Sequence, residues 1–288
     1  MLNIKKILLP VDFPDASLPV IEQAATLARH FGAEIVMLHV VTPQSRAAGV
    51  PDDGPERARW ELLTEILIMT EKNSRRALAP QLAGLTIKKL LLDGDPAHDI
   101  VQTAEQEKAD LIMMPSHGST FDQFLLGSVT AKVLHWTECP VWTGAHAGDS
   151  PAQAFAIRNV LCGVDFGLRS DESVTWASQM AAEFGARLTL AHVTAGVEFW
   201  GPGGSYVNQE WKEALVSDAS RRMDELQQRL GIKAEVFIGS GDVPKVLSQA
   251  AKHTNADLLV TGAYPYGGHL RTHGYSIICA VQIPVLNV

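Results

Sequence analysis

The sequence contains no apolar run of about 18 residues, the length that a membrane span needs, and only three cysteines. The first absence predicts a protein without a membrane-spanning segment. Three scattered cysteines exclude a disulfide framework and favour reduced thiols in a reducing compartment. No signal peptide is expected, because charge and proline closely follow the short apolar run at residues 7–9. We therefore expect a cytoplasmic protein with no membrane partner.

Basic residues are scarce as well. The chain has 24 Lys and Arg against 32 Asp and Glu, a net charge of −8. A nucleic-acid coat or a binder of anionic membranes is normally basic, so we expect neither kind of partner. Hydrophobic residues make up 46% of the 288 residues, enough to bury two cores in a chain of this length. A local pocket for an anion remains compatible with this charge balance.

Several catalytic motifs are also missing. The chain contains no Gly-x-Gly-x-x-Gly, no Gly-x-x-x-x-Gly-Lys-Ser/Thr and no Gly-x-Ser-x-Gly. These absences exclude the Rossmann dinucleotide-binding, P-loop NTPase and α/β-hydrolase interpretations. We assign no catalytic residue, because no acid–base constellation is recognisable. His269 and His273 have the spacing of helical metal ligands, but the glycines around them favour a loop, and we expect no metal site.

What the chain does contain is a repeat of itself. Residues 4–42 and 157–195 align without gaps and are identical at 13 of 39 positions, among them Val-Asp-Phe at 11–13 and 164–166. Residues 94–114 and 241–261 agree at 7 of 21 positions. Self-similarity over this length indicates a tandem duplication. We predict one domain at residues 1–146, a linker at 147–156 that is rich in Ala, Gly and Ser, and a second domain at 157–288.

Each copy alternates strand and helix patterns, which predicts an α/β fold with a parallel sheet. The expected strands are 7–11, 34–40, 85–92, 110–114 and 140–142, then 160–164, 187–193, 234–238, 257–260 and 284–288. The expected helices are 17–30, 55–82, 96–107 and 128–135, then 171–184, 209–230 and 243–252. In such sheets, ligands gather at the carboxyl ends of the strands. Residues 197–206, rich in glycine and aromatics, are expected to form a loop that acts as a lid or partner site, or packs onto its domain.

Two features at the expected strand ends favour a ligand. Gly127 and Ser128 open a helix, where free backbone amides, a hydroxyl and the helix dipole can hold a phosphate. Asp12 ends a buried strand and can bond a ribose or an adenine. Each feature has a structural alternative: Ser128 as an ordinary helix cap, and Asp12 as a turn residue that bonds its own backbone. His39 and His192, on the second strand of each copy, are expected to be buried and hydrogen-bonded.

The opening ILLPVDF, the segment ADLIMMPSHG and the close LLGSVTAKVLHWTECPV resemble the universal stress protein family. The resemblance covers nearly the whole chain twice, so it implies a tandem member. It implies an open, five-stranded parallel sheet of order 3-2-1-4-5 in each copy, an adenine-nucleotide-binding-like sandwich. One branch of the family binds ATP through Gly-x-x-Gly, nine residues and Gly-Ser/Thr. Another branch lacks this motif and does not bind ATP.

The sequence departs from the ATP-binding motif in both copies. In the first copy, Pro115 replaces the first glycine and the spacer has eight residues. In the second, Pro265 replaces the second glycine and Tyr275 stands in the Ser/Thr position, so we expect binding mainly in the first copy. The predicted ligand-binding residues of the first copy are Pro10, Val11, Asp12, Val40, Met114, Pro115, His117, Gly118, Gly127, Ser128, Val129 and Thr130. Those of the second copy are Asp165, Val193, Gly262, Gly274 and Ser276.

Three functions remain open at this point. The first is a signalling module of the universal stress response that binds ATP, AMP or another small ligand. The second is a stress-related interaction scaffold whose crevices have lost nucleotide binding. The third is an enzyme that hydrolyses ATP, which the missing acid–base groups disfavour. We also expect the two copies to mimic a dimer within one chain, with a homodimer as a further option.

Overall fold

The computed structural model describes residues 2–11, 18–42, 82–116, 126–144, 155–196, 198–201, 204–207, 209–262 and 271–288. Side chains are not described at Leu18, 198–201, 204–207 and 271–273. The chain forms two compact units. One comprises residues 3–123 and 127–155, and the other comprises 156–288 together with the short segments 1–2 and 124–126. Most of the predicted linker and most of the predicted helix 55–82 lie outside the described residues.

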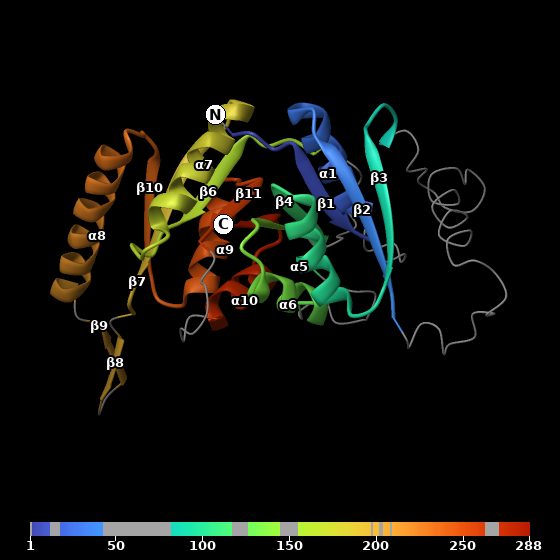
Figure 1. The fold of residues 1–288 in the computed structure, drawn as a ribbon. Coiled ribbons are helices and arrows are strands. Elements are labelled where there is room, and N and C mark those ends of the chain that lie inside the picture. The colour runs from blue at the N-terminus through green and yellow to red at the C-terminus, as the bar shows by residue number, and fades with distance from the viewer. Residues whose placement is uncertain are drawn as a thin grey trace. The chain divides into compact units, whose positions relative to one another are not determined.

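The first unit is a parallel sheet with helices packed against it (Figure 1). Its strands pair in the order β3-β2-β1-β4-β5. The elements are β1 (Lys6–Pro10), α1 (Leu18–Phe31), β2 (Glu34–Val41), β3 (Ile87–Asp93), α5 (Pro96–Glu107), β4 (Leu111–Pro115), α6 (Ser128–Trp136) and β5 (Val141–Gly144).

The second unit repeats this arrangement, with strands paired in the order β10-β7-β6-β11-β12. The elements are β6 (Asn159–Gly163), α7 (Ser170–Phe184), β7 (Arg187–Thr194), α8 (Gln209–Leu230), β10 (Glu235–Ser240), α9 (Val243–His253), β11 (Leu258–Thr261), α10 (Arg271–Ala280) and β12 (Val285–Asn287). The predicted α/β class with parallel sheets is confirmed. In each described crossover, a helix carries the chain back to the end of the sheet where the previous strand began, as parallel pairing requires.

Two segments differ from the prediction. Residues 197–206 were expected to form a loop, but the structure has an antiparallel pair of strands there, β8 (Glu198–Gly201) and β9 (Gly204–Val207). Aromatic and β-branched residues favour strands, and Phe199, Trp200, Tyr206 and Val207 are of these types. The glycine-rich stretch that ends at His273 was also expected to be a loop, but α10 already begins at Arg271.

Alternation along the strands divides the core of the first unit into two faces. One face packs against α5 and α6 in a cluster that contains Leu8, Leu38, Ile112 and Val133. The strand residues between these, such as Leu9, are equally buried, and α1 packs against β1, β2, β4 and β5. A sheet covered on both faces explains why its strands are near-continuous apolar runs.

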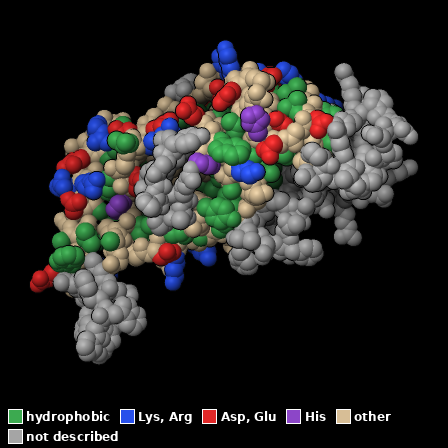
Figure 2. Space-filling view, turned by 60° about the horizontal axis from the view of Figure 1, so that its bottom comes forward, with side chains coloured by type: hydrophobic (Ala, Val, Ile, Leu, Met, Phe, Trp, Pro, Cys, Tyr) green, Lys and Arg blue, Asp and Glu red, His purple; other side chains and the backbone are tan. Residues whose placement is uncertain are grey.

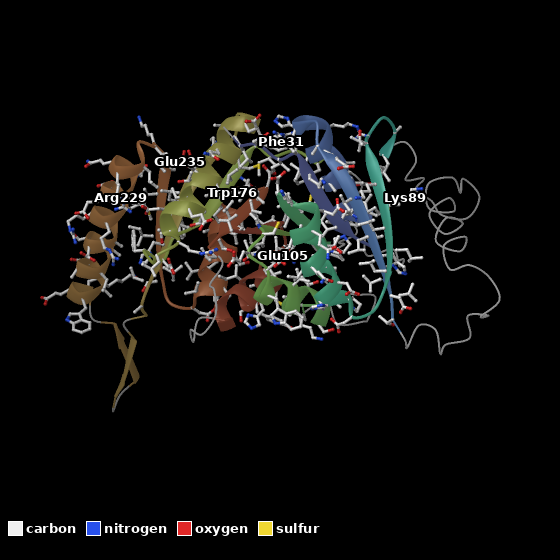
Figure 3. The ribbon with its side chains drawn as sticks, viewed as in Figure 1. Phe31, Lys89, Glu105, Trp176, Arg229 and Glu235 are labelled. Atoms are coloured by element: carbon white, nitrogen blue, oxygen red, sulfur yellow. The ribbon has the colours of Figure 1, made fainter. Side chains whose placement is uncertain are left out.

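The charged residues lie mainly at the surface. On the face drawn in Figure 2, acidic and basic side chains are interspersed, with hydrophobic side chains between them. Lys89 lies on β3, the edge strand of its unit, and Arg229 lies near the end of α8 (Figure 3). Arg229 pairs with Asp171, which links α8 to α7. None of the helices in the described ranges is long and apolar enough to cross a membrane.

Candidate functional site

The first unit brings the end of β4 and the start of α6 together. Gly127 donates its amide to the carbonyl of Ser116 at 3.0 Å, and the Thr130 hydroxyl donates to the carbonyl of Pro115 at 3.0 Å. These two bonds fix the first turn of α6 at the carboxyl end of β4. The Thr130 side chain, predicted as a ligand contact, is buried, and its bond to Pro115 holds the start of α6 against β4.

The N-terminus of α6 has no side-chain cap. Gly127 occupies the cap position, and within the described part of the chain no side-chain cap bond reaches the first turn there. Ser128 is exposed. The first amides of a helix have no partner inside the helix, and together with the helix dipole they attract anions. A glycine at the cap leaves room for a ligand to approach the backbone.

Apolar side chains of the core adjoin this helix start. Val40 of β2, Met114 of β4 and Val129 of α6 pack in one hydrophobic cluster. Met114 is buried, while Val40 and Val129 are half-buried. The site therefore combines an apolar side, suited to a flat heterocycle, with uncapped amides, suited to an anion.

The end of β1 lies beside β2. Val11 is buried, and it donates its amide to the carbonyl of Leu38 at 2.8 Å. Nδ1 of His39 lies 2.9 Å from the carbonyl oxygen of Val11. Pro10, the last residue of β1, pairs with Leu38. The predicted residues Asp12, His117 and Gly118 lie outside the described part of the chain.

In the second unit, the carboxylate of Asp165 serves its own loop. Its Oδ1 accepts the amide of Gly167 and the hydroxyl of Ser170, each at 2.8 Å. This is the arrangement of a turn residue, the structural alternative weighed for the equivalent Asp12. The aromatic ring of Phe166 lies next to it, with a ring-centre distance of 4.5 Å to His192 and of 4.2 Å to the guanidinium carbon of Arg222.

The phosphate side differs most between the units. Gly127 immediately precedes α6, whereas Gly274 lies three residues inside α10. Its neighbour Tyr275 donates its hydroxyl to the carbonyl of Leu126, at 3.3 Å. Ser276 lies further along the same helix. Gly274, predicted as a ligand-binding residue, therefore lies within a helix that begins at Arg271.

Two side chains near the second crevice had no signal in the sequence. A Cβ built on Gly262 would lie 3.6 Å from the Cβ of Arg169, so the start of α7 approaches the end of β11. Val193 is half-buried near the end of β7. Arg222 comes from α8, 30 residues after His192, and only the tertiary fold places it over Phe166. The sequence showed the repeated Val-Asp-Phe, but nothing in it predicted which residues contact the Phe166 ring.

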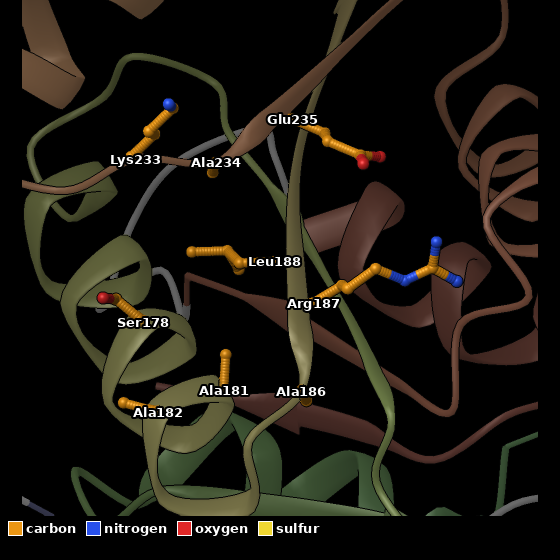
Figure 4. A pocket seen from close by; sticks show the side chains of 9 residues that line it. All are labelled: Ser178, Ala181, Ala182, Ala186, Arg187, Leu188, Lys233, Ala234 and Glu235. Carbon is orange, nitrogen blue, oxygen red and sulfur yellow. The ribbon is translucent and has the colours of Figure 1, made fainter.

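The described residues also contain a pocket of about 510 Å³ where β7 and β10 begin (Figure 4). Ala181 and Leu188 contribute apolar surface and Lys233 a charged group, whereas the side chains of Arg187 and Glu235, which also line the pocket, extend to the other side of the strands. None of the predicted ligand-binding residues lines it. It lies at the amino ends of the strands, opposite to the edge where parallel sheets bind ligands.

The cysteines are poor nucleophiles. All three are free thiols, as predicted. Burial raises the pKa of Cys139 and of Cys162 to about 12, and burial also raises the pKa of Cys279. Because the thiolate is the reactive form, these groups are unsuited to covalent catalysis at neutral pH. Within the described ranges, no three His, Cys, Asp or Glu side chains are grouped as a metal site would need.

Fold and site together define a duplicated α/β protein whose first unit offers uncapped helix amides beside an apolar surface. A family model described as "Universal stress protein family" matches residues 3–143 and again 156–273. The chain therefore belongs to the universal stress protein family, with two such domains in tandem.

Individual relatives agree with this assignment. A universal stress protein of Methanocaldococcus jannaschii is 36% identical over 140 residues, which cover 48% of this chain and 79% of that protein. One from Thermus aquaticus is 36% identical over 139 residues, 48% of this chain and 96% of that protein. The crystal structure of a universal stress protein from Archaeoglobus fulgidus covers 99% of this chain and 96% of its own, with a TM-score of 0.71 at 24% identity. That structural likeness establishes the fold alone.

Proposed function

We propose that the protein is a stress-response signalling module whose first domain binds an adenine nucleotide, ATP or AMP. The observation that carries this proposal is the uncapped start of α6, held against the end of β4 beside Val40 and Met114. The helix start suits the phosphates, and the apolar side suits the adenosine. Pro10, Val11, Pro115, Gly127, Ser128 and Val129 would line this site, together with the predicted Asp12, His117 and Gly118.

The second domain is proposed to bind nucleotide more weakly or not at all. Asp165 uses its carboxylate within its own loop, and Gly274 lies inside α10 instead of before it. An alternative function follows from the same features: an interaction scaffold that does not depend on nucleotide.

We propose binding without catalysis. The histidines described at the strand ends, His39 and His192, bond backbone carbonyls, and the buried thiols are protonated at neutral pH. No residue is therefore assigned to activate water. The cytoplasmic location and the dimer-like relation of the two domains remain predictions. Incubation with ATP and measurement of released phosphate tests the absence of catalysis. Turnover above the rate in buffer would contradict it.

Calorimetric titration of ATP into the full chain tests nucleotide binding. The wild-type protein is expected to give binding heat, and Gly127→Val is expected to abolish it, because its side chain blocks the approach of phosphate to the amides of α6. Gly274→Ala is the matched control and should leave the heat unchanged. Mass spectrometry of small molecules released on denaturation identifies a ligand carried through purification. No heat at millimolar ATP, with no nucleotide released, would contradict nucleotide binding and leave the scaffold alternative.

A further inference from the structure

Each domain has a histidine at the point where its first two strands separate. The ladder between β1 and β2 ends with Pro10 opposite Leu38, and that between β6 and β7 ends with Gly163 opposite Ala191. One residue further, the second strand continues: β2 pairs with β3 up to Val41, and β7 pairs with β10 up to Thr194. The first strand of each domain therefore stops pairing before its neighbour does.

Where the hydrogen bonds between the strands end, the imidazole bonds the next backbone carbonyl of the first strand. The carbonyl of Val11 lies 2.9 Å from Nδ1 of His39, and the carbonyl of Val164 lies 2.7 Å from Nδ1 of His192. In both cases 28 residues separate the partners. Two copies that have diverged at most other positions keep the same side chain on the same backbone atom.

The chemistry of this bond fixes the state of the ring. A carbonyl oxygen only accepts hydrogen bonds, so Nδ1 must carry the proton. A neutral His39 or His192 therefore carries its proton on Nδ1, and its Nε2 carries none. The bond selects one of the two neutral forms in each domain.

In the second domain, the loop that follows is held from several sides. Phe166 has a φ of 58°, which a bulky residue adopts only where its surroundings enforce it. Its ring lies close to both His192 and Arg222, and the neighbouring Asp165 accepts the amide of Gly167. His192 contributes twice, through its Nδ1 to the end of β6 and through its ring to Phe166.

We propose that His39 and His192 are positioning residues that, protonated at Nδ1, hold the residue that follows β1 and β6 and so shape the mouth of each crevice. A strand that continued its pairing would place its next residues along the sheet, away from the crevice. The effect on ligand binding in the first domain rests on the proposed nucleotide function. The protonation state of the rings and the order of the loops do not depend on that proposed function.

The first test needs no nucleotide. Two-bond proton–nitrogen correlation spectra of the full chain, at a pH where the rings are neutral, assign the tautomer of each histidine. His39 and His192 are expected to show a protonated Nδ1 and a bare Nε2. The exposed His98 on α5 serves as a reference that should show the usual Nε2–H form. An Nε2–H form at either His39 or His192 overturns the proposal.

The second test measures the loop. His192→Leu is expected to raise the exchange rate of the Gly167 amide about tenfold, whereas His192→Asn, which keeps an N–H donor near Nδ1, restores most of the protection. Equal exchange in both variants and the wild type overturns the positioning role. Gly167 is a suitable reporter because its amide bonds Asp165 Oδ1, next to Val164.

The third test concerns ligand affinity. His39→Leu is expected to weaken ATP binding about tenfold, and His39→Asn to stay within about threefold of the wild type. His98→Asn is the control for a remote histidine and should bind normally. Unchanged binding in His39→Leu overturns the consequence for the crevice. If the wild type binds no ATP, the proposed function fails, and the tautomer and exchange results still decide the positioning role.

Discussion

At the scale of single residues, one carboxylate in each domain bonds two consecutive backbone amides. Oδ2 of Asp110 accepts the amides of Lys5 and Lys6 at 2.7 and 2.9 Å. Oδ2 of Asp257 accepts those of Arg158 and Asn159 at 2.8 and 2.9 Å. Both clamps join the start of the fourth strand to the start of the first. Hydrogen bonds to a charged group are stronger than those between neutral groups.

Asp110→Ala is expected to lower the free energy of unfolding by about 2 kcal/mol, because it removes two charge-assisted bonds. Asp257→Ala should have a similar effect on the second domain. Urea denaturation measures both. Asp224→Ala, at an exposed position of α8, is the control and should change stability by less than about 0.5 kcal/mol. A loss as small as the control's would mean that the clamps contribute little.

Glu107 carries a pH-dependent contribution to the first domain. A hydrogen bond from Lys88, at 2.8 Å, and another from Lys6, at 3.2 Å, lower the pKa of its carboxyl below the ordinary 4.5. A lowered folded-state pKa stabilises the fold above the unfolded value, and this stabilisation is lost as the pH falls through the folded-state pKa.

Glu107→Gln is therefore expected to be less stable than the wild type at pH 7, and the difference should shrink below about pH 4.5. Urea denaturation at pH 7 and at pH 3.5 measures the two differences. Because Lys88 is largely solvent-exposed, the effect at pH 7 should be at most about 1 kcal/mol. A difference that is constant with pH would show that the ion pairs do not couple to folding.

At the scale of elements, two helices show that the backbone φ, and not the space for a side chain, decides whether a position requires glycine. Gly274 lies inside α10, and a Cβ there would meet nothing within 4 Å. Gly185 caps the end of α7 with a φ of 61°, and a Cβ there would also meet nothing. Space is equal at the two positions, but only Gly185 has the left-handed backbone that favours glycine.

Gly274→Ala is therefore expected to stabilise the second domain by about 0.5–1 kcal/mol, and Gly185→Ala to destabilise it by about 1 kcal/mol. Chemical denaturation of the two variants gives the signs directly. A destabilised Gly274→Ala would show that α10 needs the glycine for a purpose other than helix geometry.

The helix starts also differ in their caps. Asp95 and Asp242 cap α5 and α9 by accepting the amides of His98 and Lys245. The start of α6 has no such side chain. In α5 and α9, the cap side chains bond amides of the first turn. The proposed nucleotide site depends on the start of α6, where the cap residue has no side chain to do so.

At the scale of the whole molecule, two compact units with separate cores predict unfolding that is not two-state. Leu8 lies in the first core and Leu161 in the second, and both are fully buried. Leu8→Ala and Leu161→Ala should each cost about 2–5 kcal/mol. Scanning calorimetry is expected to show that each variant shifts mainly the transition of its own domain. A single transition that both variants shift equally would show that the domains unfold as one cooperative unit.

Much of the architecture was determined locally. The repeat, the α/β class and most elements follow from apolar periodicity and from caps, as at α5, where the predicted range of 96–107 matches the structure. The hairpin at 198–207 and the early start of α10 were missed, because glycine-rich segments carry little periodicity. Their conformation depends on contacts with distant parts of the chain.

The candidate site was only half determined in this way. The sequence located Gly127 and Ser128 at a helix start, because a glycine before a periodic apolar segment is a local signal. It did not show that Thr130 bonds the Pro115 carbonyl or that Asp165 bonds its own loop. Nor did it place Arg222 over Phe166. These depend on which groups the fold brings within about 3–4 Å of each other, a distance that no spacing in the sequence encodes.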